Sequence, residues 1–422
     1  MRNSRPLLLF ERTMYRDGRV PFTTVFTVQV AGELNETRLR QALDRVQAKH
    51  PLLRCVIEEA VGVPRFVLLD RAAPIPLRVV TRNGEDDWQR EARREWVMPF
   101  EASRQPLARF VWLRGGDSNE LMLVAHHCIC DGFSGINLVR ECLLACDQPG
   151  ADLSSYDTLG GIEDIAPAAL LADRRFLRRA RWKARLFRLM LWLKRRRKSE
   201  RIAPDEMYFH RWSAGDASAF MGRCRSENVT VLTAVSVAFM QAFREVHGRL
   251  GKISAMVNAR RFLPQLRDDA MFGLVPSLAL RTKKLPSDFW SQARAIRADL
   301  ARRIDRFGVG LYETFAAFES LHDKYASLID YFESAPAVRG LTMSNLGKLD
   351  FPQQYRTFRL TKVYSPLVMV SPTPANTVVL SSFAGEMEFA IISDEQSLPR
   401  ADAVAISRRA AEILEACVVG ST

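Results

Sequence analysis

Long hydrophobic runs are missing from this sequence, and cysteines are few. No apolar stretch in the 422 residues approaches the ~20 residues that a membrane-spanning helix needs. The first residues become charged too soon, after too short an apolar stretch, to form a signal peptide. Seven cysteines, an odd number over a long chain, indicate reduced thiols rather than a disulfide framework. We therefore expect a cytoplasmic protein.

Low-complexity segments are also absent. With 47% hydrophobic and 26% charged residues, the composition excludes a fibrous or wholly disordered chain. The length suits two domains, or one pseudo-duplicated unit with two lobes. Helical and strand patterns are mixed without a regular βαβ rhythm, which favours an α+β fold. We expect a first lobe over 1–172, a linker helix over 173–203 and a second lobe over 204–422.

Two adjacent histidines begin the most informative motif, His126-His127-Cys128-Ile129-Cys130-Asp131-Gly132. An apolar strand is expected before it (121–125) and an amphipathic helix after it (132–146), so the imidazoles should lie at a strand end. Because the pKa of histidine lies near neutrality, such an imidazole can take a proton from an attacking alcohol or amine. Asp131 can fix the backbone or the imidazole orientation, and Gly132 permits a backbone shape that other residues resist.

The same residue types allow other interpretations. A histidine taken alone is more often structural than catalytic. Cys128 and Cys130 beside two histidines also have the chemistry of zinc ligands, but their Cys-x-Cys spacing is tighter than the usual gap. A cysteine nucleophile flanking a histidine is a further alternative. We favour neither, and we expect no metal site.

The chain resembles the HHxxxDG acyltransferase superfamily, which unites chloramphenicol acetyltransferase with the condensation domains of nonribosomal peptide synthetases. Within it, the stand-alone polyketide-associated acyltransferases of the mycobacterial phthiocerol type are the most similar branch. Besides the motif, the segments that carry the resemblance are Phe10-Glu11-Arg12, His50-Pro51-Leu52-Leu53-Arg54, Gln105-Pro106-Leu107, Val257-Asn258-Ala259-Arg260, Phe272-Gly273 and Met343-Ser344-Asn345-Leu346-Gly347.

This resemblance implies two chloramphenicol acetyltransferase-like lobes in a V-shaped pseudo-dimer, with a tunnel between them for the two substrates. It implies that His127 is the general base and that His126 is mainly structural. Asp131 would pair with Arg260 of the second lobe and brace the motif. Gly132 would leave room for an acyl chain or a pantetheine arm.

One segment of the family, Asp-Phe-Gly-Trp-Gly, is absent, and the nearest region reads Tyr364-Ser365-Pro366-Leu367. Ser344 and Asn345 are therefore our candidates for the oxyanion or acceptor site, because removing an oxyanion donor typically costs ~10²–10³ in rate. The resemblance also implies an acyl-CoA or phosphopantetheinyl acyl carrier protein as co-substrate, with no tightly bound cofactor.

Basic residues are concentrated in one segment. Residues 174–201 hold fourteen Arg or Lys and one acid, a surplus equal to the whole net charge of +13. Phe176, Ala180, Ala184, Phe187 and Leu191 recur there at helical spacing, and Trp and Arg clusters flank them, which is typical of a helix in a membrane interface. The expected membrane or carrier contacts are Arg178, Arg179, Trp182, Arg185, Trp192, Arg195 and Arg196.

Three interpretations of this segment remain open. We favour an anionic membrane surface, followed by an acidic carrier protein or CoA, and then a solvated helix between lobes. Nucleic-acid binding is not expected, because the segment is too apolar and offers no platform for base stacking.

These observations predict an acyltransferase that moves an acyl group from a CoA or carrier-protein thioester to a hydroxyl of a lipid, polyketide or glycolipid. An O-acyltransferase is favoured over an N-acyltransferase. We expect it to be peripheral on the cytoplasmic face of the inner membrane. The alternative is an inactive, condensation-like protein that serves as a carrier-protein or membrane-binding scaffold.

Overall fold

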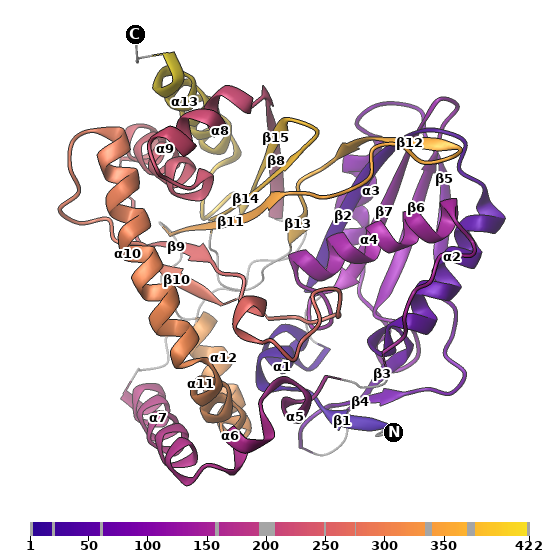
Figure 1. The fold of residues 1–422 in the computed structure, drawn as a ribbon, viewed down its shortest axis with the longest axis horizontal. Helices are drawn as coiled ribbons and strands as arrows, with labels where there is room; N and C mark the ends of the chain where they lie inside the picture. Colours follow the sequence, from indigo (N-terminus) through magenta and orange to yellow (C-terminus); the bar gives the residue numbers. More distant parts are fainter. Residues whose placement is uncertain are drawn as a thin grey trace.

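The protein folds into two lobes, each built on its own β-sheet, as a computed structural model shows (Figure 1). The predicted α+β, two-lobed architecture is confirmed. The structure describes residues 3–18, 22–59, 62–156, 160–193, 207–248, 250–274, 276–333, 340–368 and 376–419.

The first lobe contains a mixed sheet whose strand order is β12-β2-β7-β6-β5, with β13 also paired to β2. Its long central strands alternate apolar side chains between two packed faces, which is the pattern of a sheet covered on both sides. A small antiparallel sheet, β1-β4-β3, lies below it. The strands of this lobe are β1 (Ser4–Pro6), β2 (Thr23–Gly32), β3 (Cys55–Glu58), β4 (Arg65–Leu68), β5 (Leu77–Thr81), β6 (Ala108–Arg114) and β7 (Ser118–His126).

Helices α2 (Glu36–Lys49) and α4 (Gly132–Asp147) pack together on one face of the first sheet. Asn35 caps α2 by accepting from the Arg38 amide, and the helix ends at His50 before Pro51, where a proline disfavours helical backbone. Helix α3 (Asp87–Val97) lies against the second lobe. Its Trp96 packs edge-on against Phe209 of the second lobe's sheet, with ring centroids 5.9 Å apart, so α3 helps to join the lobes.

The second lobe has a six-stranded sheet of order β10-β9-β11-β14-β15-β8, covered by α8, α9, α10 and α13 (Figure 1). Its strands are β8 (Met207–Asp216), β9 (Ile253–Met256), β10 (Ser277–Ala279), β11 (Leu341–Lys348), β14 (Asn376–Phe383) and β15 (Glu386–Asp394). Its helices are α8 (Ser218–Ser226), α9 (Val231–His247), α10 (Phe289–Val309), α11 (Leu311–Glu319), α12 (Tyr325–Glu333) and α13 (Arg400–Val419).

Two strands of the second half of the chain cross to the first sheet. β12 (Phe358–Val363) and β13 (Leu367–Val368) both pair antiparallel with β2. The expected division into 1–172 and 204–422 therefore does not hold for these strands, because their backbone hydrogen bonds extend the other lobe's sheet. The exchange ties the two lobes together along most of β2, from Thr24 to Gly32.

The remaining helices lie along the lower edge of the molecule in Figure 1. They are α1 (Leu9–Tyr15), α5 (Ile162–Ile165), α6 (Ala168–Ala172) and α7 (Arg174–Leu193), and α7 packs on α11 and α12. Among the described helices none is, on its own, long and apolar enough to cross a membrane. The bent pair α8 and α9 passes that test by length and composition, but it supplies core residues of the second lobe.

Candidate active site

His127 lies where β7 ends and the turn into α4 begins. Its amide donates to the carbonyl oxygen of Phe22 (2.7 Å), and its Nδ1 donates to the carbonyl oxygen of Cys130 (2.8 Å). Because a carbonyl only accepts, Nδ1 must carry the ring proton. The Nε2 nitrogen then keeps its lone pair, and no described residue bonds to it.

The protonation of His127 follows from its surroundings. Burial lowers the pKa of His127, and the bond to the Cys130 carbonyl and the charge of Asp131 oppose this only in part. The imidazole is therefore neutral at neutral pH, as a general base requires. The structure thus places a neutral ring in one fixed tautomer at the position that the sequence singled out.

The neighbouring His126 has a different environment. Its ring lies between those of Tyr15 and Phe100, each with its centroid 5.8 Å away. Its Nδ1 accepts from the amide of Cys128 (3.2 Å), and burial lowers the pKa of His126 to about 3. His126 does not line the cavity between the lobes, so it supports the turn from within the core.

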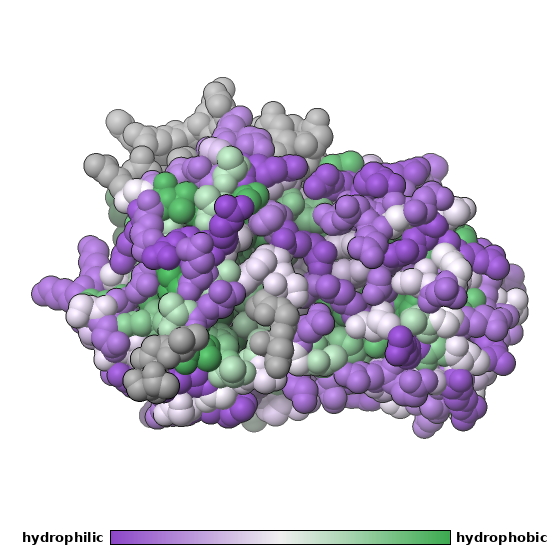
Figure 2. Space-filling model, turned by 90° about the horizontal axis from the view of Figure 1, so that it is seen from above, coloured by the Kyte–Doolittle hydropathy of each residue, from purple (hydrophilic) through white to green (hydrophobic). Residues whose placement is uncertain are grey.

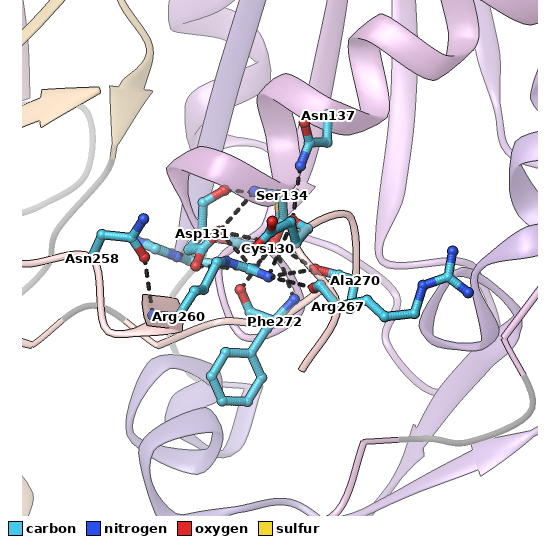
Figure 3. A network of polar contacts seen from close by, with 11 residues as sticks. Cys130, Asp131, Ser134, Asn137, Asn258, Arg260, Arg267, Ala270 and Phe272 are labelled. Atoms are coloured by element: carbon cyan, nitrogen blue, oxygen red, sulfur yellow. Dashed lines mark hydrogen bonds and ion pairs between the residues drawn. The ribbon is translucent and has the colours of Figure 1, made fainter. Parts of the chain in front are cut away.

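Asp131 is held from two directions (Figure 3). It caps α4, since its Oδ1 accepts from the amide (2.7 Å) and the hydroxyl (2.8 Å) of Ser134. The expected partner from the second lobe is present: Arg260 Nη2 lies 3.2 Å from both carboxylate oxygens. Arg260 also donates to Ser134 (2.7 Å) and to the carbonyl of Ala270 (3.0 Å). The pair is nearly excluded from solvent, with side-chain exposures of 4% for Arg260 and 6% for Asp131.

Ser134 is a bridging residue that sequence reasoning missed. Its hydroxyl lies 3.1 Å from both the amide and the carbonyl oxygen of Phe272, and the Asp131 amide donates to the same carbonyl (2.9 Å). The second-lobe loop thereby clamps the start of α4. A serine three residues after a capping aspartate is a signal of a helix start, but it does not reveal a partner so distant in the chain.

Two glycines allow the lobes to approach closely at this point. A Cβ on Gly273 would lie 2.6 Å from the His127 carbonyl oxygen, so only glycine lets the second-lobe loop lie against the motif backbone. A Cβ on Gly132 would lie 2.6 Å from the Leu346 side chain. Gly132 itself lines a cavity between the lobes, beside the end of the Leu346 side chain, so the expectation that it leaves room for a substrate stays a prediction.

A cavity of about 220 Å³ lies between the lobes, where the tunnel is expected. His127 contributes to its wall, and because Nδ1 is turned to Cys130, the edge that carries Nε2 faces the opposite way. Most of the wall is apolar. Its apolar side chains include Met14, Phe22, Phe133, Met256, Val257, Leu274, Leu346, Pro366, Val368 and Val379.

Few polar groups face this cavity from the second lobe. Ser344 and Asn345, on β11, both line it, and their role at an oxyanion or acceptor site stays a prediction. The Asn345 Oδ1 accepts from the Gly347 amide (2.7 Å), so its amide nitrogen remains for another partner. Asn258 shows the same arrangement, because its Oδ1 accepts from the Arg260 amide (3.0 Å). Asn258 had no predicted role, although it lies in a segment that carries the family resemblance.

The cysteines of the motif do not support a metal or nucleophile role. Cys128 and Cys130 are fully buried, and burial raises the pKa of both thiols well above the usual value. A thiolate nucleophile needs the opposite shift. Among the described residues, no group of three or more His, Cys, Asp or Glu is placed to hold a metal ion.

A second polar cluster joins the lobes beside the motif and was not predicted. Lys49 lies between Glu141 (2.7 Å) and Asp269 (2.6 Å), and His50 Nε2 lies 2.7 Å from Glu141. Tyr156 also donates to Asp269. Lys49 is the last residue of α2, and its bond to Asp269 ties the first lobe to the second-lobe loop that carries Arg260 and Gly273, whereas His50 bonds to Glu141 within the first lobe.

The basic helix lies away from the cavity. Arg178, Arg179, Trp182, Arg185 and Trp192 are all on α7, at the outer edge of the molecule, and none of them lines the cavity (Figure 1). The structure therefore brings the motif residues, Arg260, Ser344 and Asn345 together and leaves the α7 residues apart. Arg195 and Arg196 lie outside the described residues.

The condensation-domain family model matches residues 13–332, about three quarters of the chain. The chain belongs to the condensation-domain family. Members of this family are acyl and peptidyl transferases. The predicted resemblance is thereby confirmed.

Similar sequences belong to very long proteins. The chain is 31% identical over 148 residues to a probable non-canonical nonribosomal peptide synthetase of Salinispora arenicola, a match covering 35% of the chain and 2% of that protein. It is 34% identical over 116 residues to the cyclosporin synthetase of Tolypocladium inflatum, covering 27% of the chain and 1% of that protein. The chain thus matches only a small part of these relatives.

Solved structures share the fold over nearly the full length. Polyketide synthase associated protein 5 of Mycobacterium tuberculosis superposes with a TM-score of 0.66 at 16% identity, covering 97% of this chain and 98% of that one. The trichothecene 15-O-acetyltransferase of Fusarium sporotrichioides gives 0.69 at 11% identity, covering 98% and 95%. The first condensation domain of the calcium-dependent antibiotic synthetase gives 0.71 at 16%, covering 98% and 97%. At these identities the likeness supports the fold alone.

Proposed function

We propose that this condensation-family protein is an acyltransferase that moves an acyl group from a CoA or carrier-protein thioester to a hydroxyl of a lipid-like acceptor. An amine acceptor would require the same chemistry. The observation that carries the proposal is the fixed tautomer of His127. Its Nδ1 proton is committed to the Cys130 carbonyl, so Nε2 is available to accept a proton from a group bound in the cavity.

The reaction follows from this arrangement. The acceptor hydroxyl transfers its proton to Nε2 of His127 as its oxygen attacks the thioester carbonyl. The amide nitrogens of Asn345 and Asn258 are the candidate donors to the resulting oxyanion, because their carbonyl oxygens are already bonded. Collapse of the intermediate expels the thiolate, which takes the proton back from the imidazolium. No covalent enzyme intermediate is needed.

The nature of the acceptor is inferred from the wall of the cavity. Its lining is mainly Met, Phe, Leu and Val side chains, which favours an apolar acyl group or acceptor chain over a sugar or a nucleotide. A lipid, polyketide or glycolipid acceptor fits this wall. We place such an enzyme peripherally on the cytoplasmic face of the inner membrane, because α7 combines exposed apolar side chains with arginines.

The proposal is tested by measuring free thiol released from a panel of acyl-CoA and acyl-carrier-protein thioesters with apolar alcohols present. The His127→Ala variant should lose about 10²–10⁴-fold in turnover, the usual contribution of a general base. Cys128→Ala and Cys130→Ala are the matched controls and should retain most of it, because both thiols are buried and inert.

Other outcomes have clear meanings. Full turnover in His127→Ala would exclude the mechanism. Absence of thiol release with every donor, together with tight carrier-protein binding, would favour the scaffold alternative. Because the pKa of His127 is lowered, the wild-type rate should stay level from pH 7 to alkaline values as far as this residue is concerned, and fall only well into the acid range.

A further inference from the structure

Helix α7 carries two apolar stripes, and only one of them is used within the protein. Phe176, Ala180, Ala184 and Leu191 are buried, and Phe187 packs edge-on against Phe318 of α11, with ring centroids 5.1 Å apart. The spacing of these residues indicated an amphipathic helix, and α11, α12 and α1 cover the apolar stripe that they form.

The second stripe faces solvent. Trp182, Leu186, Leu189 and Leu193 follow one another at steps of four, three and four residues, so they lie in one line along the helix. They are 60%, 45%, 50% and 64% exposed, and Trp192 beside them is 79% exposed. Of the nine large apolar side chains that the described residues leave exposed, these five are on α7. An exposed apolar stripe of this kind on a surface helix marks an interaction site.

The basic residues of α7 fall into two groups. Lys183 and Arg179 lie 2.9 Å and 3.4 Å from Glu313, and Arg188 lies 2.8 Å from Asp323, so these three fasten the helix to the second lobe. Arg174, Arg178 and Arg185 are exposed, and none of them forms an ion pair with a described residue. Their spacing of four and seven residues places them in a second line, next to the exposed apolar stripe.

We propose that this outer face of α7, namely Trp182, Leu186, Leu189 and Leu193 with Arg174, Arg178 and Arg185, binds an anionic lipid surface. The charge fits, because arginines without acidic partners attract lipid phosphate groups. The position fits as well, because α7 lies at the outer edge of the molecule (Figure 1) and the side chains of the stripe are exposed. A tryptophan and leucines in one line beside arginines are typical of a helix that lies in the plane of a membrane interface.

A lipid surface is favoured over an acidic carrier protein because the exposed apolar stripe is long and continuous. A carrier protein that is held mainly by charge would not need such a stripe. The face that Figure 2 shows, by contrast, is mostly hydrophilic with only scattered apolar patches. The ion pairs to Glu313 and Asp323 hold α7 on the second lobe, so binding would orient the whole molecule on the membrane. The inference rests on the membrane attachment included in the proposed function, which it assigns to named residues, and it does not depend on the proposed chemistry.

The test is co-sedimentation of the full chain with vesicles of phosphatidylcholine containing phosphatidylglycerol, against vesicles of phosphatidylcholine alone. The wild type should bind the anionic vesicles and be weakened by salt. The triple variant Trp182→Ser/Leu186→Ser/Leu189→Ser should lose at least about tenfold in partitioning, because binding scales with the apolar area inserted. Arg178→Gln/Arg185→Gln should lose about tenfold at low salt, since each basic residue near the surface contributes.

Matched controls change exposed residues of the same kind elsewhere. Val79→Ser/Val97→Ser/Met98→Ser removes three exposed apolar side chains from the first lobe, and Arg71→Gln/Arg94→Gln removes two exposed arginines. Both should bind vesicles as the wild type does. Thiol release from a soluble acyl-CoA should be unchanged in every one of these variants, so a failure of the surface is distinguishable from a failure of the chemistry.

Three results would overturn the proposal. The first is equal vesicle binding by the wild type and the triple variant. The second is equal loss in the control variants. The third is a triple variant that still binds vesicles but no longer binds a purified acyl carrier protein, which would assign the face to that partner instead.

Discussion

The motif loop, residues 126–132, and helix α7 are each joined to a distant part of the chain by an arginine–aspartate pair. In the motif loop, Asp131 and Arg260 are 6% and 4% exposed. On α7, Arg188 and its partner Asp323 are 38% and 52% exposed, although their atoms are closer together, at 2.8 Å. The distance between the charged atoms therefore does not decide which pair stabilises the fold more. Water screens the charges of Arg188 and Asp323, whereas it is largely excluded from Asp131 and Arg260.

This difference in solvent exposure determines how strongly the structure of each region depends on a single side chain. Around Asp131, three donors converge on one carboxylate, namely the amide and the hydroxyl of Ser134 and the Nη2 group of Arg260. Because the pair is nearly excluded from solvent, water cannot readily replace a lost partner. The charged groups that hold α7 are partly or largely exposed, from 17% for Glu313 to 70% for Arg179, so water can replace a lost partner. One substitution should disrupt the motif loop, whereas α7 should respond only to combined changes.

The largest effect is expected at the buried pair. Arg260→Ala leaves the Asp131 carboxylate buried without its cation, which should lower the free energy of unfolding by about 3–5 kcal/mol. Urea unfolding followed by circular dichroism measures this, and thiol release should fall with it, since the motif loses its brace. The double variant Arg260→Ala/Asp131→Asn should be less destabilised, because the unpaired charge is gone. If Arg260→Ala lowered the free energy of unfolding by less than about 1 kcal/mol, the buried pair would contribute no more than an exposed one, which would contradict the expected difference between the two regions.

The sequence predicted this pair but not the cluster beside it. Histidines, aspartate and glycine at fixed spacing carry a family resemblance, and the resemblance includes the partner Arg260. Lys49, Glu141 and Asp269 carry no such pattern, because a buried ion cluster depends on which distant elements meet in the fold. The same reason explains why the contact between Gly132 and Leu346 was not predicted.

Helix α7 illustrates a second limit of sequence patterns. Helical periodicity correctly indicated a helix with apolar stripes, but it does not say which stripe the protein covers. The covering elements, α11 and α12, were not predicted at all, and neither was the passage of β12 and β13 into the first sheet. Such pairings are decided by tertiary packing, which local propensity does not encode.

The next largest effect is expected in acid, where the motif loop should make stability depend on pH and α7 should not. Burial lowers the pKa of His126 to about 3, whereas an unfolded histidine titrates near ~6.5. Above that value both states are neutral and His126 contributes nothing to the pH dependence. As the pH falls below it, only the unfolded state binds the proton, so stability should decrease by up to ~1.4 kcal/mol per pH unit.

The measurement compares the wild type with His126→Asn, whose amide oxygen can still accept from the Cys128 amide. The free energy of unfolding is determined in urea between pH 7.5 and pH 5. The wild type should show the steeper acid dependence, and parallel curves for the two proteins would contradict the assignment of His126 as a buried neutral residue. The α7 surface variants should keep the wild-type slope, because no histidine lies on that helix.

The smallest effect is expected for Arg188→Gln, which removes the exposed pair with Asp323. An exposed ion pair typically contributes ~0.2–1 kcal/mol, and Arg188 also donates to the Ser320 carbonyl, a bond that glutamine can partly replace. The free energy of unfolding should therefore change by less than about 1 kcal/mol, and by less still in high salt, because ions screen exposed charges. Urea unfolding at two salt concentrations measures both. A cost comparable to that of Arg260→Ala would mean that α7 is held as rigidly as the motif loop. The two arginine variants, measured side by side, thus ask whether burial or distance determines how strongly a cross-chain ion pair stabilises this fold.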